Sequence, residues 1–185
     1  ERIEVDATGR SRYRAINSCL LPMGLLPGRE IFTVESLAQG EALHPVQQAM
    51  VECAGSQCGY CTPGFVMSLF VGRHNGELGD ACIEGNLCRC TGYRPIRAAA
   101  ARLAASPKVQ DRFDAELARP RAALPAASLG EFHSPDSIEA ALALKARLPQ
   151  AAWFAGGTDL GVALSRKQAH APAFIALDRI AELQQ

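Results

Sequence analysis

The pattern of hydrophobic and polar residues predicts short strands at the start of the chain and helices after residue 40. In residues 1–40, a weak alternation at 12–17 and a β-branched stretch at 30–34 favour strands, with prolines and glycines marking turns between them. In residues 41–106, several segments open on a proline, which suits the first turn of a helix. The helices predicted in this part cover residues 46–53, 64–72, 80–84 and 96–105.

The pattern changes again after residue 106. Pro107, Pro120 and Pro125 stand among Ala, Arg and Asp, which is typical of a linker with room for one helix at 109–117. An amphipathic helix at 137–148, with Ser134 or Asp136 as its cap, is then followed by strands at 151–155 and 174–177. We therefore expect a multi-domain α+β chain. Its predicted parts are residues 1–40, 41–106, 107–131 (the linker) and 132–185.

Composition excludes several classes of protein. The chain has 185 residues, enough for one or two small domains, and 48% of them are hydrophobic, enough for a core. Its 19 Lys and Arg balance 19 Asp and Glu, so the basic surface of a nucleic-acid-binding protein is not expected. No apolar run approaches the roughly 20 residues of a membrane span, and no signal-peptide pattern begins the chain. We expect a cytoplasmic protein with no nucleic-acid or membrane partner.

Cysteines carry the candidate chemistry. Four of the seven form two tight pairs, Cys58 with Cys61 and Cys88 with Cys90. Without a signal peptide, such pairs indicate metal or cluster ligation rather than disulfides. A [2Fe–2S] cluster needs four thiolates, and a structural zinc site takes four cysteines in the same kind of pairs. The residues alone leave these two alternatives about equal, whereas buried free cysteines fit poorly with the flanking glycines.

The residues around the two pairs suit a cluster that carries negative charge. Gly59 and Gly92 allow positive φ and a close approach of the backbone to inorganic sulfide. Helices that start at Pro63 and Pro95 would point their positive ends towards the thiolates. Arg89, between two of the cysteines, is equally well explained as a residue that tunes the cluster potential and as a surface arginine.

The strings QCGYCTPGFVM and GNLCRCTGYRPI resemble the helical [2Fe–2S] domain of the molybdenum hydroxylase family of xanthine dehydrogenase and aldehyde oxidase, over residues 44–100. This resemblance implies a four-helix bundle with a [2Fe–2S] cluster on Cys58, Cys61, Cys88 and Cys90. It also implies that Gln57 and Cys90 lie near the molybdopterin of a partner subunit. One departure is that the family usually has a longer connection between the cysteine pairs, and the shortfall falls near Gly76 to Gly79.

Cys19 belongs to a second resemblance. The segment NSCLLP is similar to the last-ligand segment of the family's N-terminal plant-type ferredoxin domain, which has a β-grasp fold and a second [2Fe–2S] cluster. The other three ligands of that cluster lie upstream, in a C-x4-C-x2-C run that these 185 residues do not contain. Residues 1–40 are therefore expected to be the C-terminal part of that domain. Cys19 is a cluster ligand if the upstream segment exists, and otherwise a free thiol.

The string AGGTDLG follows a predicted strand and forms a candidate flavin loop. Adjacent glycines followed by a hydroxyl and a carboxylate make a turn whose backbone N–H groups can cradle a pyrophosphate. By itself this signal is weak, and it is not the G-x-G-x-x-G fingerprint of a Rossmann nicotinamide site. Together with FHSP at 132–135, however, it resembles the start of the family's FAD-binding domain. The resemblance implies that FAD is contacted by Gly156, Gly157, Thr158, Asp159 and Leu160.

The order of these parts resembles the iron–sulfur and flavin subunit of a xanthine dehydrogenase-type enzyme. The implied activity is oxidoreduction, in which electrons pass from molybdopterin on a large partner subunit through [2Fe–2S] clusters to FAD and NAD. A hetero-oligomer such as a dimer of heterodimers is implied, and no catalytic residue is expected in this chain. The alternatives are an aldehyde, nicotinate or CoA-thioester hydroxylase of the same family, and a zinc-stabilised interaction module without redox activity.

The remaining candidates are assigned structural roles. Cys53 and Cys82 match no ligand position of the family and are predicted to pack between helices. The four histidines have no ligand spacing, so solvated or helix-capping roles are favoured over metal binding: His44, His74, His133 and His170. Trp153, in a predicted strand, is expected in the core.

Overall fold

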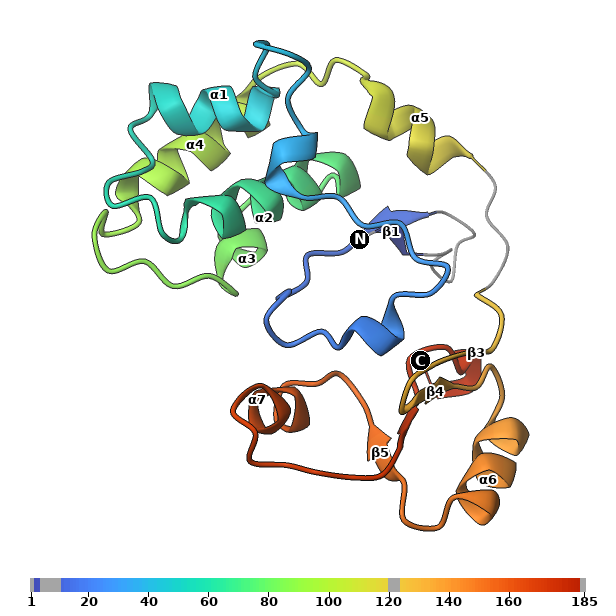
Figure 1. The fold of residues 1–185 in the computed structure, drawn as a ribbon. Coiled ribbons are helices and arrows are strands. Elements are labelled where there is room, and N and C mark those ends of the chain that lie inside the picture. The colour runs from blue at the N-terminus through green and yellow to red at the C-terminus, as the bar shows by residue number, and fades with distance from the viewer. Residues whose placement is uncertain (1, 4–10, 120–123, 184–185) are drawn as a thin grey trace. The chain divides into compact units, whose positions relative to one another are not determined.

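The structure is a computed structural model that describes residues 2–3, 11–119 and 124–183 (Figure 1). The chain divides into two compact units, one formed by residues 1–15 and 30–121 and the other by residues 16–29 and 122–185. The described residues form seven α-helices, a two-stranded sheet and a four-stranded sheet, so the predicted mixture of helices and strands is confirmed. In this part of the chain, no helix combines the length and apolar character needed to cross a membrane.

The first unit is built mainly from helices that start where the prolines predict. Three of its helices carry proline within their first two positions: α1 (Pro45–Glu52), α2 (Thr62–Asn75) and α4 (Arg94–Ala105). The short helix α3 (Asp80–Ile83) lies between α2 and α4 in the chain, and α5 (Arg112–Ala118) follows α4. Strands β1 (Arg2–Ile3) and β2 (Arg12–Tyr13) pair antiparallel. The first unit also contains the short 3-10 helix η2 (Val34–Ser36). The 3-10 helix η1 (Met23–Leu25) belongs to the second unit.

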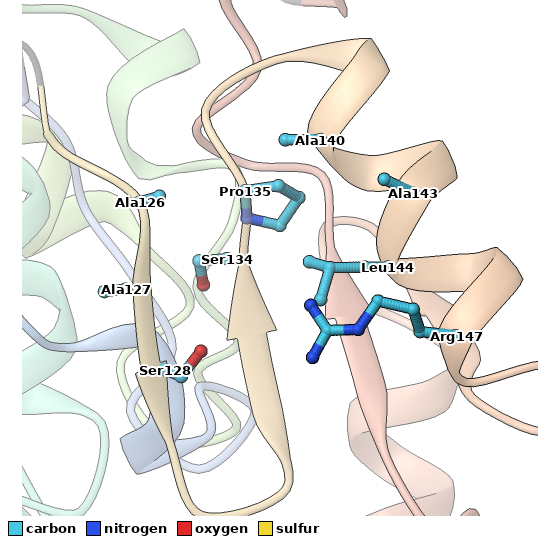
Figure 2. Close-up of a pocket in the computed structure, with 9 residues that line it drawn as sticks. All are labelled: Ala126, Ala127, Ser128, Ser134, Pro135, Ala140, Ala143, Leu144 and Arg147. Atoms are coloured by element: carbon cyan, nitrogen blue, oxygen red, sulfur yellow. The ribbon is translucent and has the colours of Figure 1, made fainter.

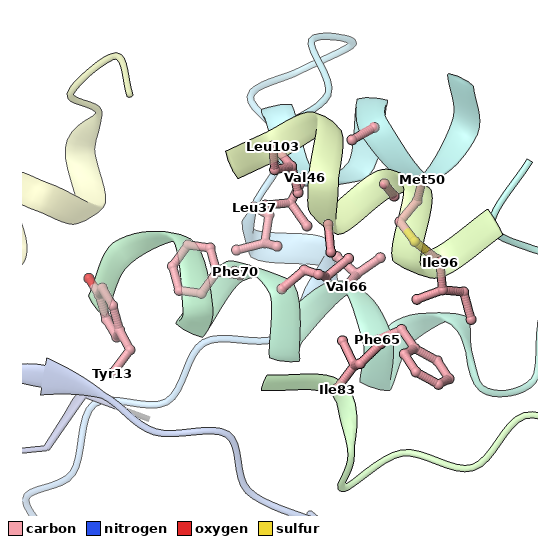
Figure 3. Close-up of a cluster of buried hydrophobic side chains, with 14 of the residues drawn as sticks. Tyr13, Leu37, Val46, Met50, Phe65, Val66, Phe70, Ile83, Ile96 and Leu103 are labelled. Carbon is pink, nitrogen blue, oxygen red and sulfur yellow. The ribbon is translucent and has the colours of Figure 1, made fainter. Parts of the chain in front are cut away.

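The core of the first unit gathers side chains from α1, α2 and α4 (Figure 3). Val46, Phe65 and Ile96 are fully buried, and burying one such side chain contributes about 1.5–3 kcal/mol to folding. Phe70, on α2, lies 4.8 Å from the ring of Phe113 and 5.0 Å from that of Tyr13, measured between centroids. These aromatic contacts fasten strand β2 and helix α5 to the helical core.

The second unit contains a sheet in the order β3-β4-β6-β5. Strands β3 (Ala127–Leu129) and β4 (Phe132–Ser134) form an antiparallel hairpin, and β6 (Phe174–Ala176) runs parallel to both β4 and β5 (Ala152–Phe154). Helix α6 (Ile138–Arg147) connects β4 to β5, and α7 (Leu160–Ser165) connects β5 to β6. The last element is the 3-10 helix η3 (Ala181–Leu183).

A shallow pocket of about 390 Å³ lies between the β3–β4 hairpin and helix α6 (Figure 2). Most of its lining residues are small or apolar, and Arg147 is the one charged residue among them. None of them belongs to the glycine turn at 156–160. This pocket is therefore separate from the predicted flavin loop.

Several local predictions are wrong. Helix α6 is capped by Ser137, whose side chain accepts from the N–H of Ala140, and not by Ser134 or Asp136. Residues 30–34 form no strand, because Val34 enters η2 and its carbonyl accepts a hydrogen bond from the side chain of Gln47. Strand β3 lies inside the predicted linker, because pairing with β4 rather than β propensity makes Ala127–Leu129 extended. Trp153 is 41% exposed rather than in the core, with Lys145 Nζ 5.8 Å from its ring centroid.

Candidate functional site

The two cysteine pairs lie on two loops that meet. Cys58 and Cys61 belong to the connection between α1 and α2, and Cys61 is the N-cap of α2. Cys88 and Cys90 belong to the connection between α3 and α4. The thiol of Cys58 lies close enough to that of Cys90, and the thiol of Cys61 to that of Cys88, for each to shift the pKa of the other. The fold therefore brings all four cysteines to one site, as two thiol pairs that each draw one cysteine from each loop.

Local backbone conformation holds the loops in this arrangement. Gly59 has φ of 84° and Gly92 has φ of 66°, as the sequence predicts, and these are conformations that glycine adopts readily. In the first loop, the hydroxyls of Ser56 and Thr62 are 2.7 Å apart. In the second, the hydroxyl of Tyr93 accepts a hydrogen bond from the backbone N–H of Cys88 at 2.9 Å. Hydrogen bonds within each loop thus preset the positions of the thiols.

The surroundings of Cys88 favour a thiolate. The side chain and the backbone N–H of Thr91 both hydrogen-bond to its sulfur, and together with the Cys90 backbone they lower the pKa of Cys88 to about 7. The pKa of Cys58 is also lowered, first by the backbone of Tyr60. Burial raises the pKa of the Cys61 thiol, and the interaction with Cys58, in which the Cys90 thiol keeps its proton, raises that of Cys90. One thiol of each pair is therefore the readier to ionise, and thiolates are the ligand form that metals take.

The spacing of the thiols bears on the choice between zinc and a cluster. Four thiolates on one zinc ion lie about 2.3 Å from it, so every pair of sulfurs is within about 4 Å. Among the described residues, no three cysteine sulfurs lie within 4.8 Å of one another. Four thiols at one site can supply two thiolates to each of two iron ions, and they do not need to meet at a single tetrahedral ion. The residues present thus fit a [2Fe–2S] cluster.

Asn86 anchors the second loop to helix α2. Its side-chain N–H donates to the buried hydroxyl of Ser68 at 2.7 Å, and its oxygen lies 2.6 Å from where a Cβ on Gly64 would be. This close approach explains the glycine in the string TPG that follows Cys61.

We expect Gly64→Ala to displace Asn86 and with it the loop that carries Cys88. The added methyl group overlaps the Asn86 oxygen, while the better helix propensity of alanine, about 1 kcal/mol, limits the loss of stability. The measurements are the iron content and the EPR line shape of the reduced protein. We expect less iron per chain or altered g-values. Gly85→Ala is the matched control, because nothing lies within 4 Å of a Cβ there. Equal spectra for the two variants would contradict the prediction.

The face around the four thiols is partly apolar and open. Cys58 and Cys90 are exposed, as is Gln57. Tyr60 is 95% exposed and Leu87 is 84% exposed, although both are large hydrophobic residues. Exposed apolar side chains gathered around a functional group are typical of a surface that binds another protein. Arg89 is exposed as well.

Cys19 belongs to a different unit of the chain from the four paired cysteines. It is exposed, and it belongs to segment 16–29 of the second unit, whereas the four paired cysteines belong to the first. Cys53 and Cys82 pack against the hydrophobic core of the first unit, as predicted.

The predicted flavin loop forms a tight turn after strand β5. Gly156 has φ of 62° and Gly157 has φ of 75°, and nothing lies within 4 Å of a Cβ on Gly156, so its backbone is open to a ligand. Thr158 and Asp159 are exposed, while Leu160 packs against the apolar cluster around Phe154. An open backbone with two exposed polar side chains fits a bound pyrophosphate.

Segment 16–29 packs beside this turn within the second unit. The carbonyl oxygen of Leu20 would lie 3.1 Å from a Cβ on Gly157 and 2.7 Å from one on Gly161. The same segment is fastened by an ion pair between Arg29 and Asp178, whose side chains are 6% and 20% exposed. Cys19, next to Leu20, is thereby held close to the glycine turn.

Sequence patterns missed a second polar cluster, which joins His44 and His74 to helix α5. His44 caps α1, accepting from the Val46 N–H at 3.3 Å, so its predicted capping role is confirmed. Its Nε2 also lies 3.0 Å from Oδ2 of Asp111, and His74 Nδ1 lies 3.1 Å from Oδ1 of Asp114. The solvated role proposed for His74 is wrong, because its side chain is fully buried. No sequence signal marks this cluster, since its members come from three distant segments.

This cluster makes the first unit sensitive to acid. Burial lowers the pKa of both histidines below 6.5, against the opposing effects of Asp111 and Asp114. The folded protein therefore resists protonation that the unfolded chain accepts, so stability is full above pH 6.5 and falls as pH drops through the lower folded pKa values. Asp114 becomes protonated only at a lower pH than the histidines. Burial raises its pKa, but Lys108, the Asp111 backbone and His74 lower it to about 2.

We expect protection of the α5 amides from hydrogen exchange, after correction for the intrinsic exchange rate, to decrease from pH 7.5 to pH 5. His74→Gln should flatten this dependence, because it removes one of the two titrating groups. The charged groups facing the histidines are Arg73, Lys108, Asp111 and Asp114. Greater protection of the α5 amides at pH 5 than at pH 7.5 would show that the predicted direction of the pH dependence is wrong.

Comparisons with known proteins agree with this geometry. Residues 33–101 match the model of the [2Fe-2S] binding domain, and residues 127–185 match that of the FAD binding domain in molybdopterin dehydrogenase. Xanthine dehydrogenase of Oryza sativa subsp. japonica is 44% identical over 98 residues, which are 49% of this chain and 7% of the relative. Human aldehyde oxidase is 46% identical over 96 residues, 48% of this chain and 7% of the relative.

A solved structure of quinoline 2-oxidoreductase from Pseudomonas putida 86 matches with a TM-score of 0.36 and 33% identity, covering 41% of this chain and 54% of that one. The chain spans about 7% of the length of the curated relatives named above. The two family models confirm the prediction of [2Fe–2S] and FAD as cofactors. Their order along the sequence is the order that the cysteine site and the glycine turn have in this chain. The chain is therefore similar, over residues 33–101 and 127–185, to the [2Fe-2S] binding domain and the FAD binding domain of molybdopterin dehydrogenases, and xanthine dehydrogenase and aldehyde oxidase are among its relatives.

Proposed function

We propose that this chain is the iron–sulfur and flavin part of a xanthine dehydrogenase-type oxidoreductase. In this proposal, electrons leave molybdopterin on a large partner subunit, pass through [2Fe–2S] clusters and reach FAD, with NAD as the final acceptor. The observation that carries it is the meeting of the two cysteine loops at one site, with the thiols arranged as two pairs. The domain boundaries proposed above at residues 40 and 106 assign this site to the helical part.

The chain's own residues supply ligands and an environment for a one-electron carrier. Cys58, Cys61, Cys88 and Cys90 hold the cluster, and a bound [2Fe–2S] cluster accepts and releases a single electron. The N-terminal ends of α2 and α4 lie next to the two loops, where unpaired backbone N–H groups favour negative charge. Hydrogen bonds from Thr91 to Cys88 stabilise the thiolate in the same way.

The exposed side of the cysteine site is proposed to face the molybdenum partner. Gln57 and Cys90 are exposed there and would lie near the molybdopterin. The apolar side chains of Tyr60 and Leu87 supply contact area for such a partner. Because the cluster would sit at this surface, the distance to the molybdopterin would be short.

The second unit is proposed to receive the electrons. Cys19 completes a ferredoxin-type cluster together with three upstream cysteines of the full protein, beside the glycine turn that binds FAD through Gly156, Gly157, Thr158, Asp159 and Leu160. The packing of Leu20 against Gly157 and Gly161 supports this placement, because it holds Cys19 next to the turn.

The substrate is a property of the molybdenum partner. Relatives named xanthine dehydrogenase and aldehyde oxidase match this chain at similar identity, 44% and 46%. We propose a purine substrate, a complex of the dimer-of-heterodimers kind and a cytoplasmic setting. A panel of xanthine, an aldehyde, nicotinate and a CoA thioester, offered to the complete complex with NAD, separates the family alternatives. Xanthine turnover by the 185-residue chain without a partner would contradict the electron-relay role.

The cofactor is tested by spectroscopy after anaerobic purification. We expect a red-brown protein with a rhombic spin-half EPR signal after reduction by dithionite, and with iron rather than zinc in elemental analysis. A colourless protein with stoichiometric zinc would support a zinc-stabilised interaction module, since Zn²⁺ is d¹⁰ and has no visible band. In the complete protein, a second distinct signal would support the Cys19 cluster.

A further inference from the structure

We propose that His44, His74 and Asp111 form a site for one divalent transition-metal ion, represented by Zn²⁺, separate from the cysteine cluster. The three residues come from three elements of the first unit: the start of α1, the last turn of α2 and the N-cap of α5. This inference does not depend on the proposed electron-transfer function.

The distances between the possible ligand atoms suit one small cation. His44 Nε2 lies 3.0 Å and His74 Nε2 lies 3.5 Å from the same oxygen, Oδ2 of Asp111. One ligand atom from each of the three residues lies within 4.8 Å of the other two. Ligands at about 2.0–2.1 Å from a tetrahedral zinc ion are about 3.3 Å apart. Only small side-chain adjustments are therefore needed to close the site around an ion.

The strongest single observation concerns His74. Its side chain is fully buried, and its Nε2 has no hydrogen-bond partner although it faces the Asp111 carboxylate. Asp114 accepts a hydrogen bond from Nδ1 at 3.1 Å and is held ionised by Lys108 at 2.7 Å, which keeps the proton on Nδ1. Nε2 therefore presents a lone pair towards a carboxylate oxygen, an arrangement that a cation between them would relieve.

The pair of Asp114 and His74 is also the arrangement found around metal-bound histidines. Such a histidine donates its other ring N–H to a carboxylate, which orients the ring and makes the ligand nitrogen more basic. Here the carboxylate is itself fixed, because Asp114 accepts from the backbone N–H of Asp111 at 3.1 Å. Two imidazoles and one carboxylate are a ligand set that zinc accepts, with water completing the coordination.

Binding through His44 requires one local change. Its Nδ1 accepts from the Val46 N–H at 3.3 Å, so its proton now lies on Nε2 and points to Asp111. With a metal ion on Nε2, the proton moves to Nδ1 and this long capping bond opens, while Gln47 continues to cap the backbone of His44 at 2.9 Å. The nearby cations are already engaged: Lys108 pairs with Asp114, and Arg73 donates to the carbonyls of Leu103 and Pro107.

The test measures zinc binding to the complete protein with its clusters assembled, after dialysis against EDTA. We expect calorimetric titration with ZnCl₂ to show one site per chain. X-ray absorption at the zinc edge should give nitrogen and oxygen ligands at about 2.0–2.1 Å, and no sulfur shell at about 2.3 Å. A sulfur shell, or no uptake of zinc, would overturn the proposal by itself.

Variants locate the ion. Asp111→Asn keeps a good helix cap and should weaken binding more than about 100-fold, since loss of an outer-shell partner alone weakens metal sites by about 10–100-fold. Asp114→Asn should weaken zinc binding by the smaller factor of about 10–100. His74→Gln should weaken it as much as Asp111→Asn does. His170→Gln, at an exposed histidine of the second unit, should bind as the parent protein does. Unchanged affinity in both Asp111→Asn and His74→Gln would overturn the assignment.

Discussion

Replacing Cys88 with serine should abolish the [2Fe–2S] signal of the helical part of this chain. Serine keeps the size of the side chain but removes the sulfur, and four thiolates are needed for the cluster. Cys88 is the most consequential choice because its thiolate is stabilised most, with a pKa lowered to about 7 by Thr91 and the Cys90 backbone. The measurement is iron content together with EPR after dithionite, where we expect no rhombic signal from this site.

Cys53→Ser is the matched control for that experiment. Cys53 is half-buried in the same unit, packs against the core and lies only five residues before Cys58 in the sequence. It should keep the iron and the signal, at a small loss of stability. If Cys88→Ser retains a normal spectrum, the proposed ligand set is incorrect; if Cys53→Ser loses its spectrum, the loss in Cys88→Ser reflects disturbed packing instead.

Asp178→Ala should produce the largest loss of stability in the second unit, about 3–5 kcal/mol. The change removes the Asp178 carboxylate from the guanidinium of Arg29, which is only 6% exposed. The effect is measured by urea unfolding of the 185-residue chain, followed through the fluorescence of Trp153. Trp153 is the one tryptophan of the sequence and lies in β5, so it reports on this unit. Asp159→Ala, at an exposed carboxylate of the same unit, should change the free energy of unfolding by no more than about 0.5 kcal/mol.

A double variant separates the ion pair from other effects of losing Asp178. Arg29→Met together with Asp178→Leu removes both charges, and replacing a buried pair by apolar side chains is often close to neutral. We therefore expect the double variant to be more stable than Asp178→Ala. An unfolding midpoint for Asp178→Ala equal to that of the parent chain would mean that the pair contributes nothing.

Local chemistry explains why much of the cysteine site could be predicted. Helices α2 and α4 begin within two residues of the predicted positions, because Pro63 and Pro95 suit only the first turn. Gly59, Gly92, Gly156 and Gly157 all have the positive φ that their places in the motifs indicate. Such signals act over a few residues, so a sequence reports them directly.

These local signals could not predict strand pairing and side-chain packing between distant segments. Strand β3 is extended because it pairs with β4, although its residues resemble a linker. Trp153 is partly exposed because its strand lies at the edge of the sheet order β3-β4-β6-β5 and its ring turns towards Lys145. In both cases the neighbouring elements decide the outcome, and the local residue pattern does not name them.

By itself, the sequence determined the cysteine pairs, the helices that begin beside them, the glycine turn and the family resemblance that connects them. Only the tertiary structure brought the thiol of Cys58 close to that of Cys90 and the thiol of Cys61 close to that of Cys88. It also assigned residues 16–29 to the second unit and buried His44 and His74 next to Asp111. The physical reason is that ligand spacing and turn conformation are local properties. Contacts between side chains far apart in the sequence arise only when helices and strands pack together.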